Sequence, residues 1–300
     1  MHRRTALQTL LATCSLPYLS RGFAGPAGPE SANIKYAVQQ YSFNHQLRSG
    51  ELKIEDFPKT TVEGTGIKAL EYFNGHFEDR ARDEAFFKDL RKRTDDLGAI
   101  NTMMLCRSAD ALDSPDASER KRAVEGYRPW LEGTKILGGK YIRVDVRSRG
   151  DAAKQKLYAI SGLEAVCKVA AQYDLGILVE NHGNYSSNGA WLAGVMQEVD
   201  AKNCGTLPDF QNFSDYDPYQ GVQEMMPWAK IVCAKSKKFD AQGNEVNVDF
   251  RRMLKIVLDA KFSGYIGIEF EGHETAPVDG INATRRLLDK VIDELTTAKK

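Results

Sequence analysis

Short apolar stretches alternate with longer amphipathic stretches along most of the chain, with a repeat of about 25 to 35 residues. The short stretches predict β-strands, and the amphipathic stretches between them predict helices, which is the order expected of parallel βα units. The predicted strands lie at 34–40, 67–72, 100–105, 141–146, 176–180, 205–209, 230–235 and 265–269. Eight such units predict one (β/α)8 barrel, a TIM barrel, over residues 34–297.

The clearest helical periodicity lies in the last third of the chain. Apolar residues at 250, 253, 254 and 257, and again at 287, 288, 291, 292 and 295, follow the spacing of one buried helix face. The glycine fingerprint of a dinucleotide site does not follow the first predicted strand, which argues against an open doubly wound sheet. The pattern therefore favours a closed barrel.

The N-terminus has the features of an export signal. Arg3 and Arg4 precede an uncharged apolar run at 6–19, and small residues follow at Ala24 and Gly25. We expect a cleaved signal peptide at 1–25 and a linker at 26–33. The paired arginines are typical of the twin-arginine signal, with an ordinary secretory signal as the alternative. The mature protein is then expected in the periplasm or elsewhere outside the cytoplasm, without a membrane anchor.

Charge and cysteine content exclude some partners. Lysine plus arginine and aspartate plus glutamate both number 41, so the chain has no general positive field for nucleic acid. Four cysteines follow the predicted leader without a paired spacing, and we expect free, mostly buried thiols.

Several predicted strands end in an acidic residue directly after an apolar one. These acids are Glu71, Asp145, Glu180, Asp209 and Glu269. The carboxyl ends of the strands form the active-site face of a (β/α)8 barrel, so this placement predicts a carboxylate-rich mouth.

Three of these acids, Glu180, Asp209 and Glu269, are the predicted ligands of one divalent metal. Converging carboxylates repel one another unless a cation or protons neutralise them. Oxygen ligands suit Mn²⁺ or Mg²⁺, whereas Zn²⁺ or Co²⁺ becomes possible if nitrogen or sulfur joins. Ordinary salt-bridged acids at the barrel end are the alternative interpretation.

The sequence resembles the sugar phosphate isomerase/epimerase group of xylose isomerase-like barrels, within it an exported subgroup. The resemblance lies in LVENHG at 178–183, GTLPDF at 205–210, VCAKS at 232–236 and GIEFEG at 267–272, together with YSFNH at 41–45 and LEYFN at 70–74. The resemblance implies a metal held by Glu, Asp, His and Glu from strands five to eight. Glu180, Asp209 and Glu269 match this set, but Cys233 stands in the position of the histidine.

Further site residues follow from position and resemblance. His182 projects to the same side as Glu180, so it is a candidate for metal or substrate contact, as Cys233 is for metal. The remaining substrate-binding candidates are His45, Glu71, Asn74 and Arg143. For Arg143, an internal ion pair with Asp145 is the equal alternative.

The predicted activity is proton transfer next to a sugar carbonyl, as in isomerases and epimerases. Lys235 and the metal would stabilise the enediolate while Glu180 or Glu269 moves the proton. A structural ion pair of Lys235 with Glu269 or Asp209 is the alternative. If the substrate is a 3-keto-glycoside, its enolate could instead expel the glycosidic oxygen, and the protein would then be a lyase. A sugar-binding barrel without activity is a third possibility. The sequence leaves the sugar and the oligomeric state open.

Overall fold

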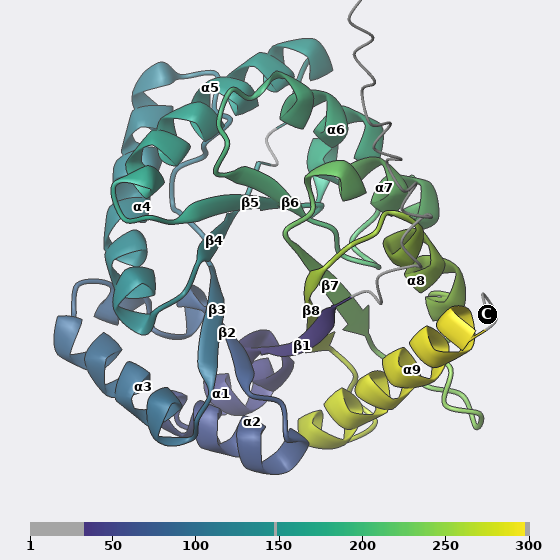
Figure 1. The fold of residues 1–300 in the computed structure, drawn as a ribbon. Helices are drawn as coiled ribbons and strands as arrows, with labels where there is room; N and C mark the ends of the chain where they lie inside the picture. The colour runs from purple at the N-terminus through teal and green to yellow at the C-terminus, as the bar shows by residue number, and fades with distance from the viewer. Residues whose placement is uncertain (1–32, 147–148, 298–300) are drawn as a thin grey trace, which may run out of the picture. The chain divides into compact units, whose positions relative to one another are not determined.

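The computed structural model describes residues 33–146 and 149–297. Within them, eight parallel strands form a ring that is surrounded by helices (Figure 1). The strands are β1 (Ile34–Gln39), β2 (Ala69–Phe73), β3 (Ile100–Leu105), β4 (Tyr141–Val144), β5 (Gly176–Glu180), β6 (Cys204–Leu207), β7 (Ile231–Ser236) and β8 (Gly264–Phe270). This architecture confirms the predicted (β/α)8 barrel.

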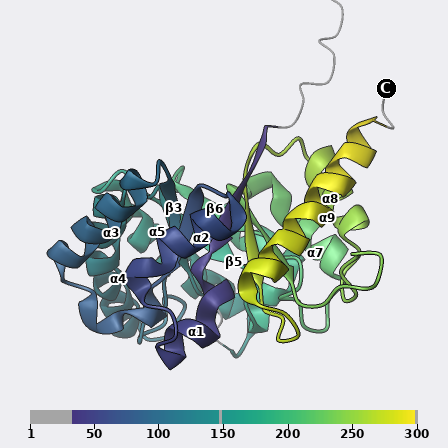
Figure 2. The same cartoon turned by 90° about the horizontal axis from the view of Figure 1, so that it is seen from below.

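Helices cover the outside of the ring and connect successive strands. They are α1 (Asn44–Ser49) and α2 (Phe57–Thr65) after β1, then α3 (Glu84–Asp96), α4 (Ala117–Leu137), α5 (Ala152–Ala171), α6 (Gly189–Glu198), α7 (Pro218–Met225), α8 (Phe250–Asp259) and α9 (Pro277–Thr297). Figure 2 shows α9 running along the outside of the barrel beside α8. None of the helices in the described ranges is long and apolar enough to cross a membrane.

Most of these helices have an Asp or Asn residue at the N-cap position. The side chains of Asp83, Asp116, Asp151, Asn188, Asp217 and Asp249 accept hydrogen bonds from backbone N–H groups of the first helical turn. Such caps satisfy donors that have no partner inside the helix. The predicted apolar face of α8 is confirmed, because all four of its members are buried.

The ring is closed least firmly between β6 and β7. All other neighbouring strands pair as parallel ladders, in the order β6-β5-β4-β3-β2-β1-β8-β7, with one register shift in the β2–β3 ladder between Leu70 and Glu71. Two isolated bridges lie between β6 and β7: Thr206 of β6 pairs with Ala229 just before β7, and Asp209 just after β6 pairs with Cys233 of β7. The predicted strand at 205–209 is therefore too long: β6 ends at Leu207, because Pro208 has no N–H for a ladder.

The barrel interior is a packed core with a polar end. Along the strands, inward-facing apolar residues alternate with outward-facing ones that pack beneath the helices. The apolar residues inside the barrel are Phe73, Met103, Leu105, Leu178, Leu207, Ile231 and Cys233. The other predicted strands differ from the observed ones by at most two residues at an end. The predicted signal at 1–25 and nearly all of the linker at 26–33 lie outside the described residues.

Candidate functional site

Four predicted site residues lie at the carboxyl ends of β5 to β8, inside the barrel mouth. Glu180 is the last residue of β5, Asp209 follows β6 by two residues, and Lys235 and Glu269 are paired neighbours in β7 and β8. All four side chains are buried. A carboxylate or ammonium is rarely buried unless it is paired, so the contacts of each one define the site.

Lys235 is the centre of one group of charges. Its ammonium nitrogen lies 2.9 Å from Oε2 of Glu269, 3.6 Å from Oδ2 of Asp209 and 3.2 Å from Oε1 of Glu271. Burial alone would lower the pKa of Lys235, but Asp209 and Glu269 raise it well above its ordinary value. The structure therefore shows the ion pairs that were the structural alternative for this lysine, and it holds the positive charge among three acids.

Asp209 is held rigidly by its own loop. Its Oδ1 accepts hydrogen bonds from the backbone N–H groups of Gln211 (2.7 Å) and Asn212 (2.9 Å). The amide side chain of Asn181 bonds both to the backbone N–H of Asp209, at 2.8 Å, and to its backbone oxygen, at 3.0 Å. The other carboxylate oxygen, Oδ2, is buried and has no hydrogen-bond partner. The charged group beside this oxygen is the Lys235 ammonium, at 3.6 Å.

Cys233 lies beside the same acids. Its Sγ is 3.5 Å from Oε2 of Glu269, and one ligand atom from each of Asp209, Cys233 and Glu269 falls within 4.8 Å of the others. This buried Asp/Cys/Glu group could hold a metal ion. Burial, together with the neighbouring acids, raises the pKa of the Cys233 thiol well above its ordinary value, so without a metal the sulfur is protonated.

Glu180 belongs to a second group of charges. Nε and Nη2 of Arg143 both lie 2.5 Å from Oε2 of Glu180, and Nδ2 of Asn212 donates to Oε1 at 2.8 Å. Nη1 of Arg143 also lies 2.9 Å from Oδ1 of Asp145, which is 3.1 Å from Nδ1 of His182. The structure thus brings Asp209, Cys233 and Glu269 together, but it pairs Glu180 with Arg143.

The acids of the mouth differ in proton affinity. Burial raises the pKa of Glu269 to about 7 and that of Asp209 to about 6, although Lys235 opposes both shifts. Burial would also raise the pKa of Glu180, but Arg143, with His182 and Lys235, holds it below its usual value. Near neutral pH, Glu269 can therefore exchange a proton, whereas Glu180 remains ionised.

Glu71 and Asn74 lie deeper than the sequence suggests. Glu71 is fully buried, accepts a hydrogen bond from Oγ1 of Thr102 at 3.1 Å, and has a pKa raised to about 8 by burial. Its Oε2 lies against β8, where a Cβ on Gly267 would be 2.5 Å away. Both polar atoms of the Asn74 side chain bond to the backbone of Arg107. Their contact with substrate stays a prediction.

The histidines have different positions. His45 is exposed on α1, and His182 is partly buried at the mouth, with 24% of its side chain exposed. On the β1–β2 side, Tyr41, Phe73 and His76 form an aromatic group, with Tyr41 packed edge-on against Phe73. Sequence analysis missed this group, as it missed Asn181 and Asn212. The clue available was that each of these residues lies within a few positions of a predicted strand end.

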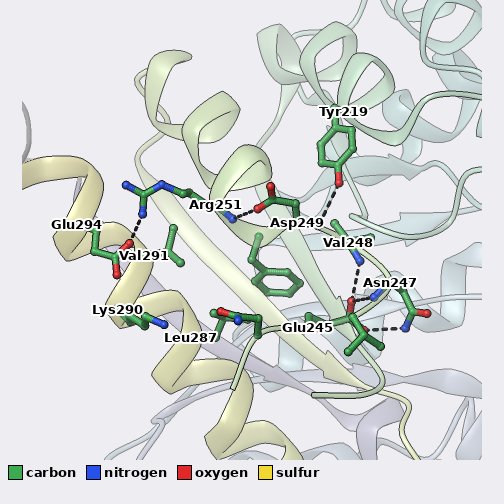
Figure 3. Close-up of a pocket in the computed structure, with 13 residues that line it drawn as sticks. Tyr219, Glu245, Asn247, Val248, Asp249, Arg251, Leu287, Lys290, Val291 and Glu294 are labelled. Carbon is green, nitrogen blue, oxygen red and sulfur yellow. Dashed lines mark hydrogen bonds and ion pairs between the residues drawn. The ribbon is translucent and has the colours of Figure 1, made fainter. Parts of the chain in front are cut away.

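A groove of about 510 Å³ lies elsewhere, between the loop that precedes α8 and the helices α8 and α9 (Figure 3). Glu245 in this groove accepts hydrogen bonds from the backbone N–H groups of Asn247 and Val248, and Arg251 pairs with Glu294. These groups are satisfied by loop and helix contacts. The buried charges at the mouth, in contrast, include an Asp209 oxygen that accepts no hydrogen bond and carboxyl groups with strongly shifted pKa values, which mark the mouth as the candidate site.

A family model described as xylose isomerase-like TIM barrel matches residues 61–291. The chain belongs to this family. The match confirms the resemblance found in the sequence and agrees with the barrel described above. No curated protein sequence matches the chain.

Similar solved structures cover nearly the whole barrel at low identity. A D-psicose 3-epimerase with D-tagatose from Clostridium cellulolyticum H10 has a TM-score of 0.70 and 13% identity, covering 86% of this chain and 99% of that one. An IolI protein with a bound zinc atom has a TM-score of 0.70 and 13% identity, covering 87% and 98%. The 3-keto-D-glucoside 4-epimerase YcjR from E. coli has a TM-score of 0.62 and 13% identity, covering 86% and 99%. These similarities establish the fold.

Proposed function

We propose that this protein is a sugar isomerase or epimerase that transfers a proton next to a carbonyl group. The observation that carries the proposal is the contact at 2.9 Å between the buried Lys235 ammonium and the Glu269 carboxyl group, whose pKa in the metal-free protein is raised by burial to about 7. A group that exchanges protons near neutral pH thus lies beside a buried positive charge. Proton removal next to a carbonyl needs both, because it creates an oxyanion.

Each residue has a part in this reaction. Glu269 would remove the proton from the carbon beside the carbonyl and return it. Lys235 would donate a hydrogen bond to the oxyanion that forms. Glu180, kept ionised by Arg143, would accept hydrogen bonds from substrate hydroxyl groups, and His182 would contact the substrate from the mouth.

Asp209, Cys233 and Glu269 are the residues that would hold a divalent metal. Oδ2 of Asp209 fits this role, because it is buried and accepts no hydrogen bond, with the Lys235 ammonium 3.6 Å away, and such an acceptor is costly unless something binds it. A sulfur beside two carboxylates favours Zn²⁺ or Co²⁺ over Mg²⁺ or Mn²⁺. When bound, such an ion would polarise the carbonyl group.

Solvent isotope exchange tests the proposed function. Purified protein is incubated with free keto-sugars and with 3-keto-glucosides in deuterated water, and incorporation of deuterium beside the carbonyl is followed by NMR. We expect exchange with the wild type and a loss of about 10²- to 10⁴-fold with Glu269→Gln. Glu294→Gln, in the groove between α8 and α9, is the control and should exchange normally.

The other outcomes separate the alternatives. Release of the aglycone from a 3-keto-glucoside would identify a lyase, since elimination starts with the same proton removal. Sugar binding without any exchange would identify a binding protein and contradict the proposal.

We also propose that the protein acts outside the cytoplasm, in the periplasm or an equivalent compartment. The paired Arg3 and Arg4 before the apolar run support this location. Mass spectrometry of the intact protein, purified from the periplasm of a Gram-negative expression host, should show that about the first 25 residues have been removed. Retention of the whole N-terminus on exported protein would contradict the proposal, and replacing both arginines by lysine tests the twin-arginine route.

A further inference from the structure

The two oxygens best placed to bind a metal are the same two that Lys235 contacts. Oε2 of Glu269 faces the sulfur of Cys233 at 3.5 Å, and it is also the atom 2.9 Å from the lysine nitrogen. Oδ2 of Asp209 accepts no hydrogen bond, and it lies 3.6 Å from the same nitrogen. The lysine and a metal therefore share their ligands.

Geometry keeps the two cations close together. A metal bonded to Oε2 of Glu269 at about 2.1 Å would lie within about 5 Å of the lysine nitrogen as it now stands. Two positive charges at that separation inside a buried site repel each other strongly, because little solvent screens them. The ammonium has to move, or the metal binds weakly.

A second position is available for the ammonium. Glu271 lies two residues after Glu269, its Oε1 is already 3.2 Å from the lysine nitrogen, and 24% of its side chain is exposed. Glu271 is outside the Asp209, Cys233 and Glu269 group. Glu271 can therefore keep the Lys235 charge neutralised while the two inner carboxylates, those of Asp209 and Glu269, bind another cation.

We propose that Lys235 is an internal counter-ion that competes with a metal ion for Asp209 and Glu269, and that it shifts to Glu271 when the metal binds. Lys235 thereby sets how tightly the site holds metal. The inference rests on the proposed function only for the identity of the metal ligands. Its test needs no substrate, so its failure is distinguishable from a failure of catalysis.

The test is calorimetric titration of metal-free protein with Zn²⁺. We expect Lys235→Met to bind zinc at least about tenfold more tightly than the wild type, because a nearby positive charge is removed. Lys237→Met is the matched control: it removes the same charge two residues away, from a side chain that contacts Glu271 but neither inner carboxylate. Its affinity should stay within about twofold of the wild type.

A double-mutant cycle tests the shift to Glu271. Glu271→Gln should weaken zinc binding in the wild type more than in the Lys235→Met background, because only the wild type has a displaced ammonium to neutralise. Equal effects in both backgrounds would contradict the shift. Zinc affinity unchanged or weaker in Lys235→Met, or no zinc binding by either protein, would overturn the proposal.

Stability measurements keep the test interpretable if Lys235→Met folds poorly. Without the lysine, the acids around it lose their counter-ion, so the metal-free variant should melt at a lower temperature. Zinc should then raise the melting temperature of Lys235→Met by more than it raises that of the wild type. An equal or smaller rise would count against the proposal, and Lys235→Gln provides a second variant for the same comparison.

Discussion

At the scale of residues, Glu180 and Glu269 show how one side-chain type acquires two roles. Both are buried at strand ends in the same mouth. Arg143 lies against Glu180 and keeps its pKa low, whereas Glu269, which shares Lys235 with two other acids, has a pKa of about 7. Environments that separate the pKa values of like groups divide acid–base roles between them. The assignment of proton transfer to Glu269 follows from this difference.

Glu71 gives a prediction about pH at the same scale. Its pKa is about 8 in the folded protein because of burial, against 4.5 for the ordinary side chain. Between these values the folded protein binds a proton that the unfolded chain has released, so raising the pH destabilises the fold. Glu71→Gln removes the carboxyl group that takes up this proton, and its amide oxygen can still accept the hydrogen bond from Thr102.

The measurement is the free energy of unfolding in urea at about pH 5 and pH 8. We expect the difference between Glu71→Gln and wild type to shift in favour of the variant by on the order of 3 kcal/mol across that range. A difference that stays constant with pH would show that Glu71 ionises normally in the folded protein.

At the scale of elements, the helices are placed by close contacts as well as by apolar faces. Gly162 in α5 packs directly against the backbone of the segment between β3 and α4, where an added Cβ would collide with the carbonyl group of Leu112. Backbone cannot move away as the end of a flexible side chain can. A glycine in a helix interior, which is otherwise unfavourable, is required here by packing.

Two alanine substitutions test this packing. Gly162→Ala should destabilise the protein by roughly 2 kcal/mol or more through overpacking. Gly194→Ala in α6 meets only the flexible end of Lys156, at 3.1 Å, and should be neutral or stabilise by about 0.5 to 1 kcal/mol. Thermal unfolding of both variants checks the signs, and similar effects would refute the packing argument.

At the scale of the whole barrel, the weak closure between β6 and β7 lies directly beneath the site. Asp209 and Cys233 form one of the two bridges across this seam. Two of the three residues proposed to hold a metal, Asp209 and Cys233, thus belong to the part of the ring with the fewest strand-to-strand hydrogen bonds. A bound cation would add a cross-link at that point.

Hydrogen exchange tests the seam. We expect amides of residues 204–210 to exchange faster than those of β4, because regions with fewer hydrogen bonds open more readily. β4 is a fair control, since it has four residues, as β6 does, but forms ladders on both sides. Equal protection of the two strands would show that the ring is closed as firmly at β6–β7 as elsewhere.

The sequence alone determined the eight βα units and the acids at the strand ends, because apolar periodicity and strand-terminal residues are local properties of the chain. Strand bounds were less certain at β6, where the effect of Pro208 on the ladder was not recognised. The sequence also placed Lys235 near Asp209 and Glu269, since residues at the ends of neighbouring parallel strands meet at one face.

Only the tertiary structure decided which charges pair. The tilt and closure of the ring put Arg143 against Glu180, and they place Cys233 beside Glu269 and Glu71 against Gly267. These partners are tens to hundreds of residues apart, and their distances depend on the register of every strand between them. The spacing of residues within one strand carries no information about the combined register of several strands. The full burial of Glu71 and the division of the acids into two groups are therefore seen only in the folded barrel.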